Sequence, residues 1–304
     1  MKIVLFGKDG QLGQAIQSIA LPEDVTLIAF GRDTANFEQP QSLRKIIADI
    51  KPDIIINAAA YTQVDKAEEE YDLAHMINAV APSVLAEEAS KIGAWLIHYS
   101  TDYVFDGKKQ GAYTETDTPA PLSAYGRTKR DGDEAISQHH DKYIIFRTCW
   151  CYSQYGQNFA KTMLNLAQTR EQLKIVSDQI GAPTNALLIA KITEQMIDKI
   201  SKNSIAAGIY NLSASGHVSW YDYAKTLIQT ARDEGLPITV KDDGLIPVLA
   251  KDYGAKAIRP HNSRLDTSKL STALGIDLPN WKEDVISFTK NFCKTQKEKN
   301  GLSS

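Results

Sequence analysis

Short apolar runs alternate with helix-length amphipathic segments through the first half of this chain, and this alternation constrains the fold more than any other feature. The runs are continuously apolar, which is typical of strands buried on both faces of a parallel sheet. The expected strands are Lys2–Phe6, Val25–Phe30, Asp53–Asn57, Trp95–Tyr99 and Tyr143–Phe146, and the expected helices are Gln11–Ile19, Gln41–Ile50, Ala74–Ile92 and Tyr125–Gln138. We therefore expect an α/β fold with a doubly wound parallel sheet, whose ligands bind beyond the carboxyl ends of the strands.

The alternation weakens after about residue 150. Helical patterns cover Asn158–Thr169, Ala186–Ile200 and Ser219–Glu234, and a further strand is expected at Ile209–Leu212. Residues 236–260 show no clear periodicity, and the polar tail 294–304 is expected to fray. We assign residues 1–150 to the sheet domain, with some later helices returning to it. Residues 151–304 then form mainly a smaller, interleaved α/β domain.

Composition excludes several classes of protein. The chain has 304 residues and a net charge of −3, which gives no electrostatic basis for binding nucleic acid or an anionic membrane. No apolar run reaches the roughly 18 residues of a membrane span. The three cysteines do not suggest a disulfide framework. We expect a cytoplasmic protein that binds neither nucleic acid nor membrane.

A glycine-rich turn, Gly7-Lys-Asp-Gly10-Gln-Leu-Gly13, directly follows the first expected strand and opens a helix. Glycines at this place let backbone N–H groups approach a pyrophosphate, which is also attracted to the positive helix N-terminus. The spacing is G-x-x-G-x-x-G rather than the more common G-x-G-x-x-G. Within a βαβ pattern it still predicts a dinucleotide site in the first domain, of the Rossmann type.

The end of the second expected strand indicates which dinucleotide is bound. Enzymes that use NAD usually carry an acidic residue there for the ribose hydroxyls. This chain has Arg32, whose guanidinium can pair with a 2′-phosphate, so we expect NADPH. Asp33 follows it, so NADH remains possible. Small residues after the third strand, in Asn57-Ala-Ala-Ala60-Tyr-Thr62, let the backbone lie against a flat ligand.

A tyrosine and a lysine four residues apart, Tyr125 and Lys129, lie on one face of an expected helix. A lysine ammonium beside a tyrosine favours the phenolate and lowers its pKa toward neutral pH. Thr101 follows the fourth expected strand and would hold a carbonyl oxygen against the tyrosine. These three residues predict proton transfer to a carbonyl, which becomes reduction when a hydride donor is bound nearby.

Together these motifs resemble the extended short-chain dehydrogenases/reductases and, within them, the family of dTDP-4-dehydrorhamnose reductases. The matching segments span nearly the whole chain: Phe6–Gly13, Asn57–Ala60, Val64–Glu68, His98–Phe105, Tyr125–Lys129, Phe146–Thr148, Asn158–Leu164, Asp178–Thr184 and Arg259–Leu265. The resemblance implies a Rossmann fold, NADPH as hydride donor, and a dTDP-linked 4-keto-6-deoxysugar as substrate.

The resemblance also implies roles for individual residues. Tyr125 would be the proton donor, Lys129 its partner and a ligand of the nicotinamide ribose, and Thr101 a ligand of the C4 carbonyl. The cofactor contacts would be Gly7, Gly10, Gln11, Leu12, Gly13, Arg32, Asn36, Phe37, Ala60, Tyr61, Thr62, Tyr125 and Lys129. The substrate contacts would be Thr101, Asp102, Trp150, Arg259 and Asn262.

Some members of the family bind magnesium through glutamates at a dimer contact. The positions that we align with two of those glutamates are Ala15 and Leu187, so we expect no metal, and a monomer or a homodimer without a metal bridge. Two alternatives remain open: a reductase or epimerase of another nucleotide 4-ketosugar, and a non-catalytic dinucleotide-binding regulatory subunit. Arg32 disfavours an epimerase that retains NAD, and the complete set of Thr101, Tyr125 and Lys129 disfavours a binding module.

Overall fold

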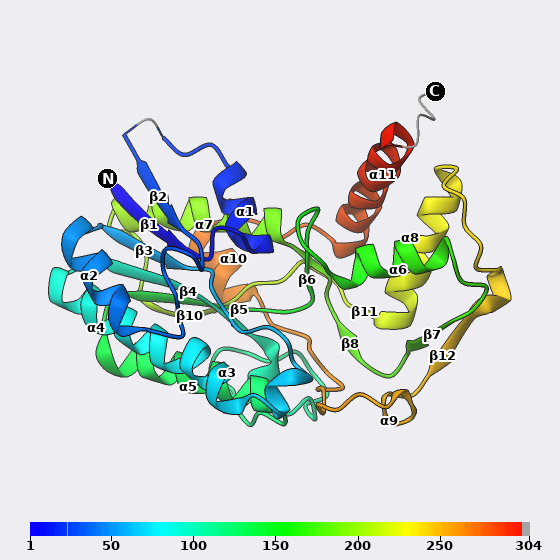
Figure 1. The fold of residues 1–304 in the computed structure, drawn as a ribbon, viewed down its shortest axis with the longest axis horizontal. Helices are drawn as coiled ribbons and strands as arrows, with labels where there is room; N and C mark the ends of the chain where they lie inside the picture. The colour runs from blue at the N-terminus through cyan, green and yellow to red at the C-terminus, as the bar shows by residue number, and fades with distance from the viewer. Residues whose placement is uncertain (23, 300–304) are drawn as a thin grey trace.

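A six-stranded parallel sheet forms the larger part of the molecule (Figure 1). The structure, a computed structural model, describes residues 1–22 and 24–299. The strand order is β10-β5-β4-β3-β1-β2, and every neighbouring pair is parallel. The strands are β1 (Lys2–Phe6), β2 (Thr26–Phe30), β3 (Ile54–Asn57), β4 (Trp95–Thr101), β5 (Tyr143–Thr148) and β10 (Gly208–Asn211). The expected doubly wound sheet is confirmed.

Each apolar strand supplies two cores because successive side chains point to opposite faces. Ile3 and Leu5 of β1 pack on one face under α1 (Gln11–Ser18) and α7 (Ala186–Ser201), while Val4 and Phe6 pack on the other. The second face is covered by α2 (Gln41–Ile50), α4 (Ala81–Ile92) and α5 (Ala124–His139). Because both faces of each strand are buried, the strand sequence must be continuously apolar.

The helix expected over Ala74–Ile92 is continuous in space but not uniform. It begins earlier, as α3 (Tyr71–His75), continues through a π-helical segment (Met76–Val80), and then becomes α4. π segments concentrate near functional sites. This one lies against α5, where a Cβ on Gly132 would come within 2.1 Å of the Asn78 carbonyl oxygen.

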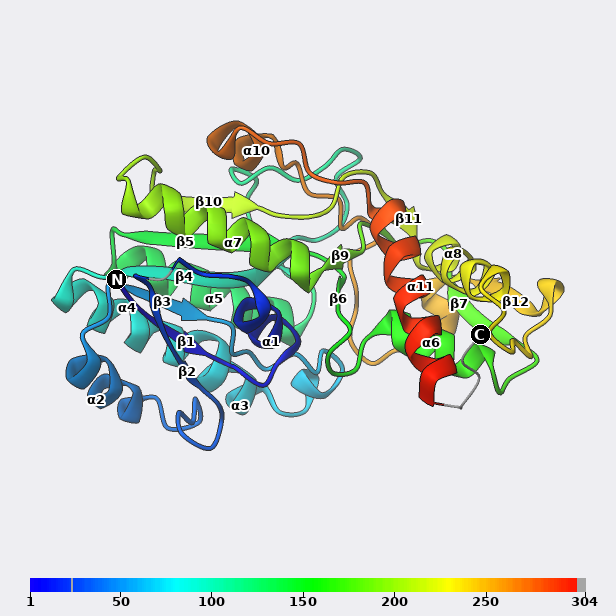
Figure 2. The ribbon, with the colours of Figure 1, turned by 90° about the horizontal axis from the view of Figure 1, so that it is seen from above.

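A second, smaller unit lies beside the carboxyl edge of the sheet (Figure 2). It contains α6 (Phe159–Ala167), α8 (Trp220–Asp233), α9 (Ala250–Tyr253), α11 (Trp281–Lys299), and the parallel pair β7 (Leu173–Val176) and β12 (Leu245–Val248). Two further short strand pairs are β6 (Cys151–Tyr152) with β9 (Thr184–Asn185), and β8 (Ile180–Gly181) with β11 (Val218–Ser219). The elements α7, β10 and α10 (Ser268–Leu274) return to the larger unit.

Two features of the second half differ from expectation. Residues 236–260 show no clear periodicity in the sequence, yet they contain β12 and α9. A four-residue strand that includes Pro247 is too short to recognise from its sequence pattern, and β12 forms by pairing with β7. Residues 294–299 of the tail are helical as the end of α11, and residues 300–304 lie outside the described residues. None of the helices in the described part combines the length and apolarity of a membrane span.

Candidate functional site

The three positions of the first turn, Gly7, Gly10 and Gly13, require or allow glycine for different structural reasons. Gly7 has a φ of +84°, and a Cβ on Gly13 would lie 2.0 Å from the Gly7 carbonyl oxygen, so both allow the turn to pack closely on α1. A Cβ on Gly10 would approach nothing closer than 3.4 Å, so this glycine leaves open space at the helix N-terminus. No side chain caps α1. Its first N–H groups are therefore oriented toward that open space, which suits a pyrophosphate.

A cavity of about 390 Å³ extends from this turn along the ends of β2 and β3. Most of the predicted cofactor residues line it: Gly7, Gly10, Arg32, Asn36, Phe37, Ala60, Tyr61 and Thr62. Arg32 is paired with Glu38 at the cavity wall, and its side chain is 82% exposed. A cavity with an exposed guanidinium at its edge fits an adenosine whose ribose carries a 2′-phosphate.

The remaining predicted cofactor residues of this region lie on α1 and do not line that cavity. Leu12 packs into the core under the sheet, and Gly13 is buried against Gly7. The side-chain Oε1 of Gln11 accepts a hydrogen bond of 2.9 Å from the Nδ2 of Asn158, the residue that caps α6 in the smaller unit. Gln11 thus links the two units across the first turn.

The loop that carries Tyr61 is held by the π-helical segment. Asn78 accepts a hydrogen bond from the Tyr61 N–H at 2.9 Å and donates to the Tyr61 carbonyl at 3.0 Å. The same amide donates to Thr128 on α5 at 3.1 Å. The cofactor loop and the helix of Tyr125 and Lys129 are therefore fixed by one buried side chain.

Lys129 is buried, with 1% of its surface exposed, and burial lowers its pKa to about 8. Its Nζ donates to the Tyr99 carbonyl at 2.7 Å and lies 2.9 Å from His98 Nε2. Burial, rather than Lys129, has the largest effect on the pKa of Tyr125. Burial raises the pKa of Tyr125 well above its ordinary value, and a hydrogen bond with Thr101 opposes that shift only in part.

Thr101 ends β4 and caps the turn that follows, accepting a hydrogen bond from the Tyr103 N–H at 3.2 Å. Asp102 is 2% exposed, and burial raises its pKa to about 7. Its Oδ1 is 3.3 Å from the Thr101 hydroxyl, whereas Oδ2 has no hydrogen-bond partner among the described residues. Thr101, Asp102 and Tyr125 thus form one polar group at the carboxyl edge of the sheet, in which Thr101 and Asp102 are buried and Tyr125 is partly exposed.

Trp150 follows β5 in a left-handed backbone conformation, with a φ of +48°. Its ring stacks on Trp220 with a centroid distance of 3.6 Å and an interplanar angle of 14°. A Cβ on Gly181 would lie 2.6 Å from the Trp150 ring, so the glycine allows this approach. One face of Trp150 is therefore covered by Trp220, a residue that sequence analysis did not identify.

Arg259 and Asn262 have different environments although both were expected to contact substrate. Arg259 lines a cavity and pairs with both oxygens of Asp65, at 2.7 and 3.1 Å. The side-chain amide of Asn262 donates to the carbonyls of Lys109 and Gly111, and its oxygen accepts from Arg264. Its polar side-chain atoms thus join two backbone segments, and its contact with substrate stays a prediction.

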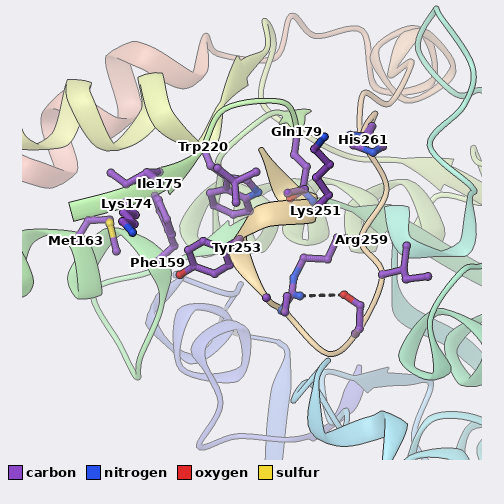
Figure 3. Close-up of a pocket in the computed structure, with 16 residues that line it drawn as sticks. Phe159, Met163, Lys174, Ile175, Gln179, Trp220, Lys251, Tyr253, Arg259 and His261 are labelled. Carbon is purple, nitrogen blue, oxygen red and sulfur yellow. Dashed lines mark hydrogen bonds between the residues drawn. The ribbon is translucent and has the colours of Figure 1, made fainter. Parts of the chain in front are cut away.

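The cavity beside Arg259 has a volume of about 480 Å³ and lies in the smaller unit (Figure 3). Apolar side chains gather at one end, among them Phe159, Met163 and Ile175, and the polar side chains Lys251 and His261 lie nearer Arg259. Among the residues that line this cavity, Arg259 is the one that the sequence had indicated as a substrate contact. Its lining comes from four separate stretches of chain, each with an ordinary local pattern.

The described residues contain no group of three or more His, Cys, Asp or Glu side chains that could hold a metal. Ala15 and Leu187, the positions aligned with magnesium ligands, line a cleft between α1, α6 and α11 in which Asp284 is the one acidic residue.

Comparisons with known proteins agree on one family. Residues 1–293 match the family model described as the RmlD substrate binding domain. The dTDP-4-dehydrorhamnose reductase of Escherichia coli K12 is 44% identical over 289 residues, covering 94% of this chain and 96% of that protein. Among solved structures, that of the Bacillus anthracis dTDP-4-dehydrorhamnose reductase in complex with NADP has a TM-score of 0.85 at 35% identity, covering 94% of this chain and 98% of that one. The Clostridium acetobutylicum dTDP-4-dehydrorhamnose reductase has a TM-score of 0.87 at 37% identity, covering 98% of this chain and all of the other.

Proposed function

Because this chain belongs to the family of dTDP-4-dehydrorhamnose reductases, we propose that it reduces the C4 ketone of dTDP-4-dehydro-L-rhamnose to give dTDP-L-rhamnose, with NADPH as reductant. The observation that carries the proposal is the contact of Thr101 with Tyr125 at the carboxyl edge of the sheet, with the buried Lys129 one turn along α5. The cavity of the first unit lies at this same edge.

The nicotinamide, when bound, supplies a hydride to the carbonyl carbon. Negative charge then develops on the carbonyl oxygen, where Thr101 donates a hydrogen bond and Tyr125 donates a proton. The raised pKa of Tyr125 suits this direction of reaction, because the phenol stays protonated at neutral pH and is ready to donate. Lys129 stabilises the phenolate that forms as the proton leaves.

The dinucleotide would occupy the first unit. The N-terminus of α1 at Gly10 would hold the pyrophosphate, and the predicted residues that line the cavity would enclose the adenosine. Gln11 and Leu12 would contribute backbone N–H groups, and Gly13 close packing. Arg32, released from Glu38, would pair with the 2′-phosphate, which favours NADPH without excluding NADH.

The nucleotide part of the substrate would occupy the cavity of the smaller unit. Its apolar end, with Phe159 and Trp220, suits a pyrimidine base, and its cationic end, with Arg259 and Lys251, suits a diphosphate. Asp102 and Trp150 would then contact the deoxysugar between the two cavities. The unpartnered Oδ2 of Asp102 is an acceptor for a sugar hydroxyl.

We also propose that residues 1–150 act as the dinucleotide domain and residues 151–304 mainly as the substrate domain. We further propose that the enzyme is a monomer or a homodimer and is cytoplasmic; the cytoplasmic location is supported by the three cysteines, which are free thiols, two of them buried. Size-exclusion chromatography with light scattering measures the oligomeric state directly.

Replacement of Tyr125 with Phe tests the catalytic proposal. We expect a fall in kcat of about 10²- to 10⁴-fold with NADPH affinity retained, since a phenyl ring fills the same space and donates no proton. Turnover is followed by NADPH oxidation with a panel of dTDP-linked 4-ketosugars, and NADPH affinity by fluorescence titration. Near-normal turnover by the variant would remove Tyr125 from this role, and interconversion of sugars without consumption of NADPH would instead identify an epimerase.

A further inference from the structure

The buried lysine of the site has an unusual set of partners. Lys129 Nζ contacts the Tyr99 carbonyl oxygen and His98 Nε2, and it forms no ion pair among residues 1–22 and 24–299. His98 is itself buried, with 1% of its surface exposed. The contact with the carbonyl requires an N–H of the lysine. The contact with the imidazole depends on which ring nitrogen carries the proton.

Asn57 determines the histidine tautomer. Its Oδ1 accepts a hydrogen bond of 3.1 Å from the Ala59 N–H, so its Nδ2 is the atom that faces His98 Nδ1, at 3.0 Å. An amide nitrogen only donates, so Nδ1 must be the acceptor. Burial lowers the pKa of His98 well below its ordinary value, so the ring is neutral and its single proton is on Nε2.

This tautomer distinguishes the two charge states of Lys129. The Nε2–H points at Lys129 Nζ, and only the neutral amine has a lone pair to accept it. An ammonium would place one donor against another. Turning the Asn57 amide over would let His98 move its proton to Nδ1, but the amide NH₂ would then face the Ala59 N–H. One mismatched pair of donors remains in either arrangement.

We propose that His98 is a positioning residue for Lys129, donating its Nε2–H to the amine that remains when Lys129 has given up a proton. The inference rests on the proposed roles of Tyr125 and Lys129. In each turnover the Tyr125 O–H bond breaks as the sugar O–H bond forms, and the phenolate regains a proton that Lys129 supplies. Solvent then returns a proton to the amine. His98 holds the amine in place throughout and neither gains nor loses a proton.

Other groups around Lys129 act on the same equilibrium. Asp133, one turn further along α5, favours the ammonium, and its own charge is shared with Ser100 and Arg147. Tyr99 contributes its carbonyl oxygen, which accepts from either charge state. Burial opposes the ammonium. His98 adds a directional preference for the amine, which none of these groups provides.

The tautomer is measured directly by ¹⁵N NMR of the histidine rings in the full-length protein, a readout that does not depend on turnover. The chain has six histidines, and the signals lost in His98→Gln identify those of His98. We expect a neutral ring with its proton on Nε2 between about pH 6 and pH 9. A proton on Nδ1, or a protonated ring in that range, would overturn the proposal.

The pH dependence of kcat/KM provides the second test. In His98→Gln the amide oxygen can accept from the ammonium, so the pKa of Lys129 rises and the alkaline limb moves up by about one pH unit or more. His140→Gln is the matched control, because His140 is also buried but lies away from the site. Its Nε2 is 2.8 Å from the Ala94 carbonyl oxygen. We expect this control to lose stability and keep the wild-type limb.

An alkaline limb unchanged in His98→Gln, or moved equally in His140→Gln, would contradict the role of His98. Such a result leaves the proposed function intact if Tyr125→Phe still abolishes turnover. Conversely, an active Tyr125→Phe enzyme removes the proposed catalytic roles whatever tautomer the NMR spectrum gives.

Discussion

The two walls of the catalytic cleft hold their charged groups in different ways. In the catalytic wall, formed by β4, β5 and α5, the Asp133 and Arg147 side chains are 2% and 3% exposed. In the nucleotide wall, formed by residues 250–265, Arg259 and its partner Asp65 are 24% and 44% exposed. A buried pair is costly to break and an exposed pair is not. We therefore expect the catalytic wall to be rigid and the nucleotide wall to be adjustable.

Breaking the buried pair should give the largest effect. Arg147→Met leaves the Asp133 carboxylate with Ser100 as its remaining hydrogen-bond partner, so we expect a loss of about 3–5 kcal/mol in the free energy of unfolding. Urea denaturation measures the loss. The double variant with Asp133→Asn should recover part of it, because no unpaired charge is then buried. A loss below about 1 kcal/mol would show that the two walls do not differ in this respect.

Asp102, also on the catalytic wall, should affect stability in a pH-dependent way. Its pKa is raised from 3.8 to about 7, so the folded state disfavours the carboxylate and loses stability as pH rises through this window. Asp102→Asn removes that cost. The variant should therefore be more stable than wild type at pH 8, by a few kcal/mol at most, with a smaller difference near pH 4. Thermal unfolding at both pH values tests this, and a difference independent of pH would contradict it.

On the nucleotide wall, Asp65→Asn should change binding more than stability. Arg259 keeps its hydrogen bond to the Ala257 carbonyl but loses its ion pair, and one amide oxygen replaces the two carboxylate oxygens, so its guanidinium is held less firmly at the cavity. Because the ion pair is lost and only one acceptor oxygen remains, we expect KM for the nucleotide sugar to rise by up to about tenfold with kcat retained, and the free energy of unfolding to change by less than about 1 kcal/mol. Glu69→Gln, which removes only the neighbouring ion pair of Lys256, is the control and should leave KM unchanged.

The smallest effect is expected at the exposed edge of the cofactor cavity. Arg32→Ala should raise KM for NADPH roughly fivefold and leave KM for NADH unchanged, since only NADPH has a 2′-phosphate for the guanidinium. Steady-state kinetics with both cofactors measures the ratio. An equal rise for both would place Arg32 outside the 2′-phosphate site.

The catalytic wall was largely predictable from sequence. A buried parallel strand needs a continuous apolar run, and residues four apart on a helix share a face, so the ends of β3 and β4 and the positions of Tyr125 and Lys129 could be placed in advance. What could not be predicted was the partner of Lys129. His98 begins the recognised segment His98–Phe105, yet its contact with Lys129 depends on how closely α5 approaches β4.

The nucleotide wall was predictable only through resemblance. Phe159, Ile175, Trp220 and Tyr253 are separated by stretches of ordinary sequence, and no short spacing connects them. Asn262 shows what a recognised motif leaves out: its amide also donates to the backbone of a neighbouring loop, at Lys109 and Gly111.

By itself, the sequence determined the parallel sheet, the glycine turn and the order of the catalytic residues along the chain, because local periodicity and backbone sterics act over a few residues. Tertiary structure alone decided the partners: Asp65 with Arg259, Trp150 with Trp220, and His98 between Asn57 and Lys129. These contacts join residues from 31 to 194 positions apart in the sequence. Their formation depends on the packing of whole elements, and the charge and orientation of each catalytic group follow from that packing.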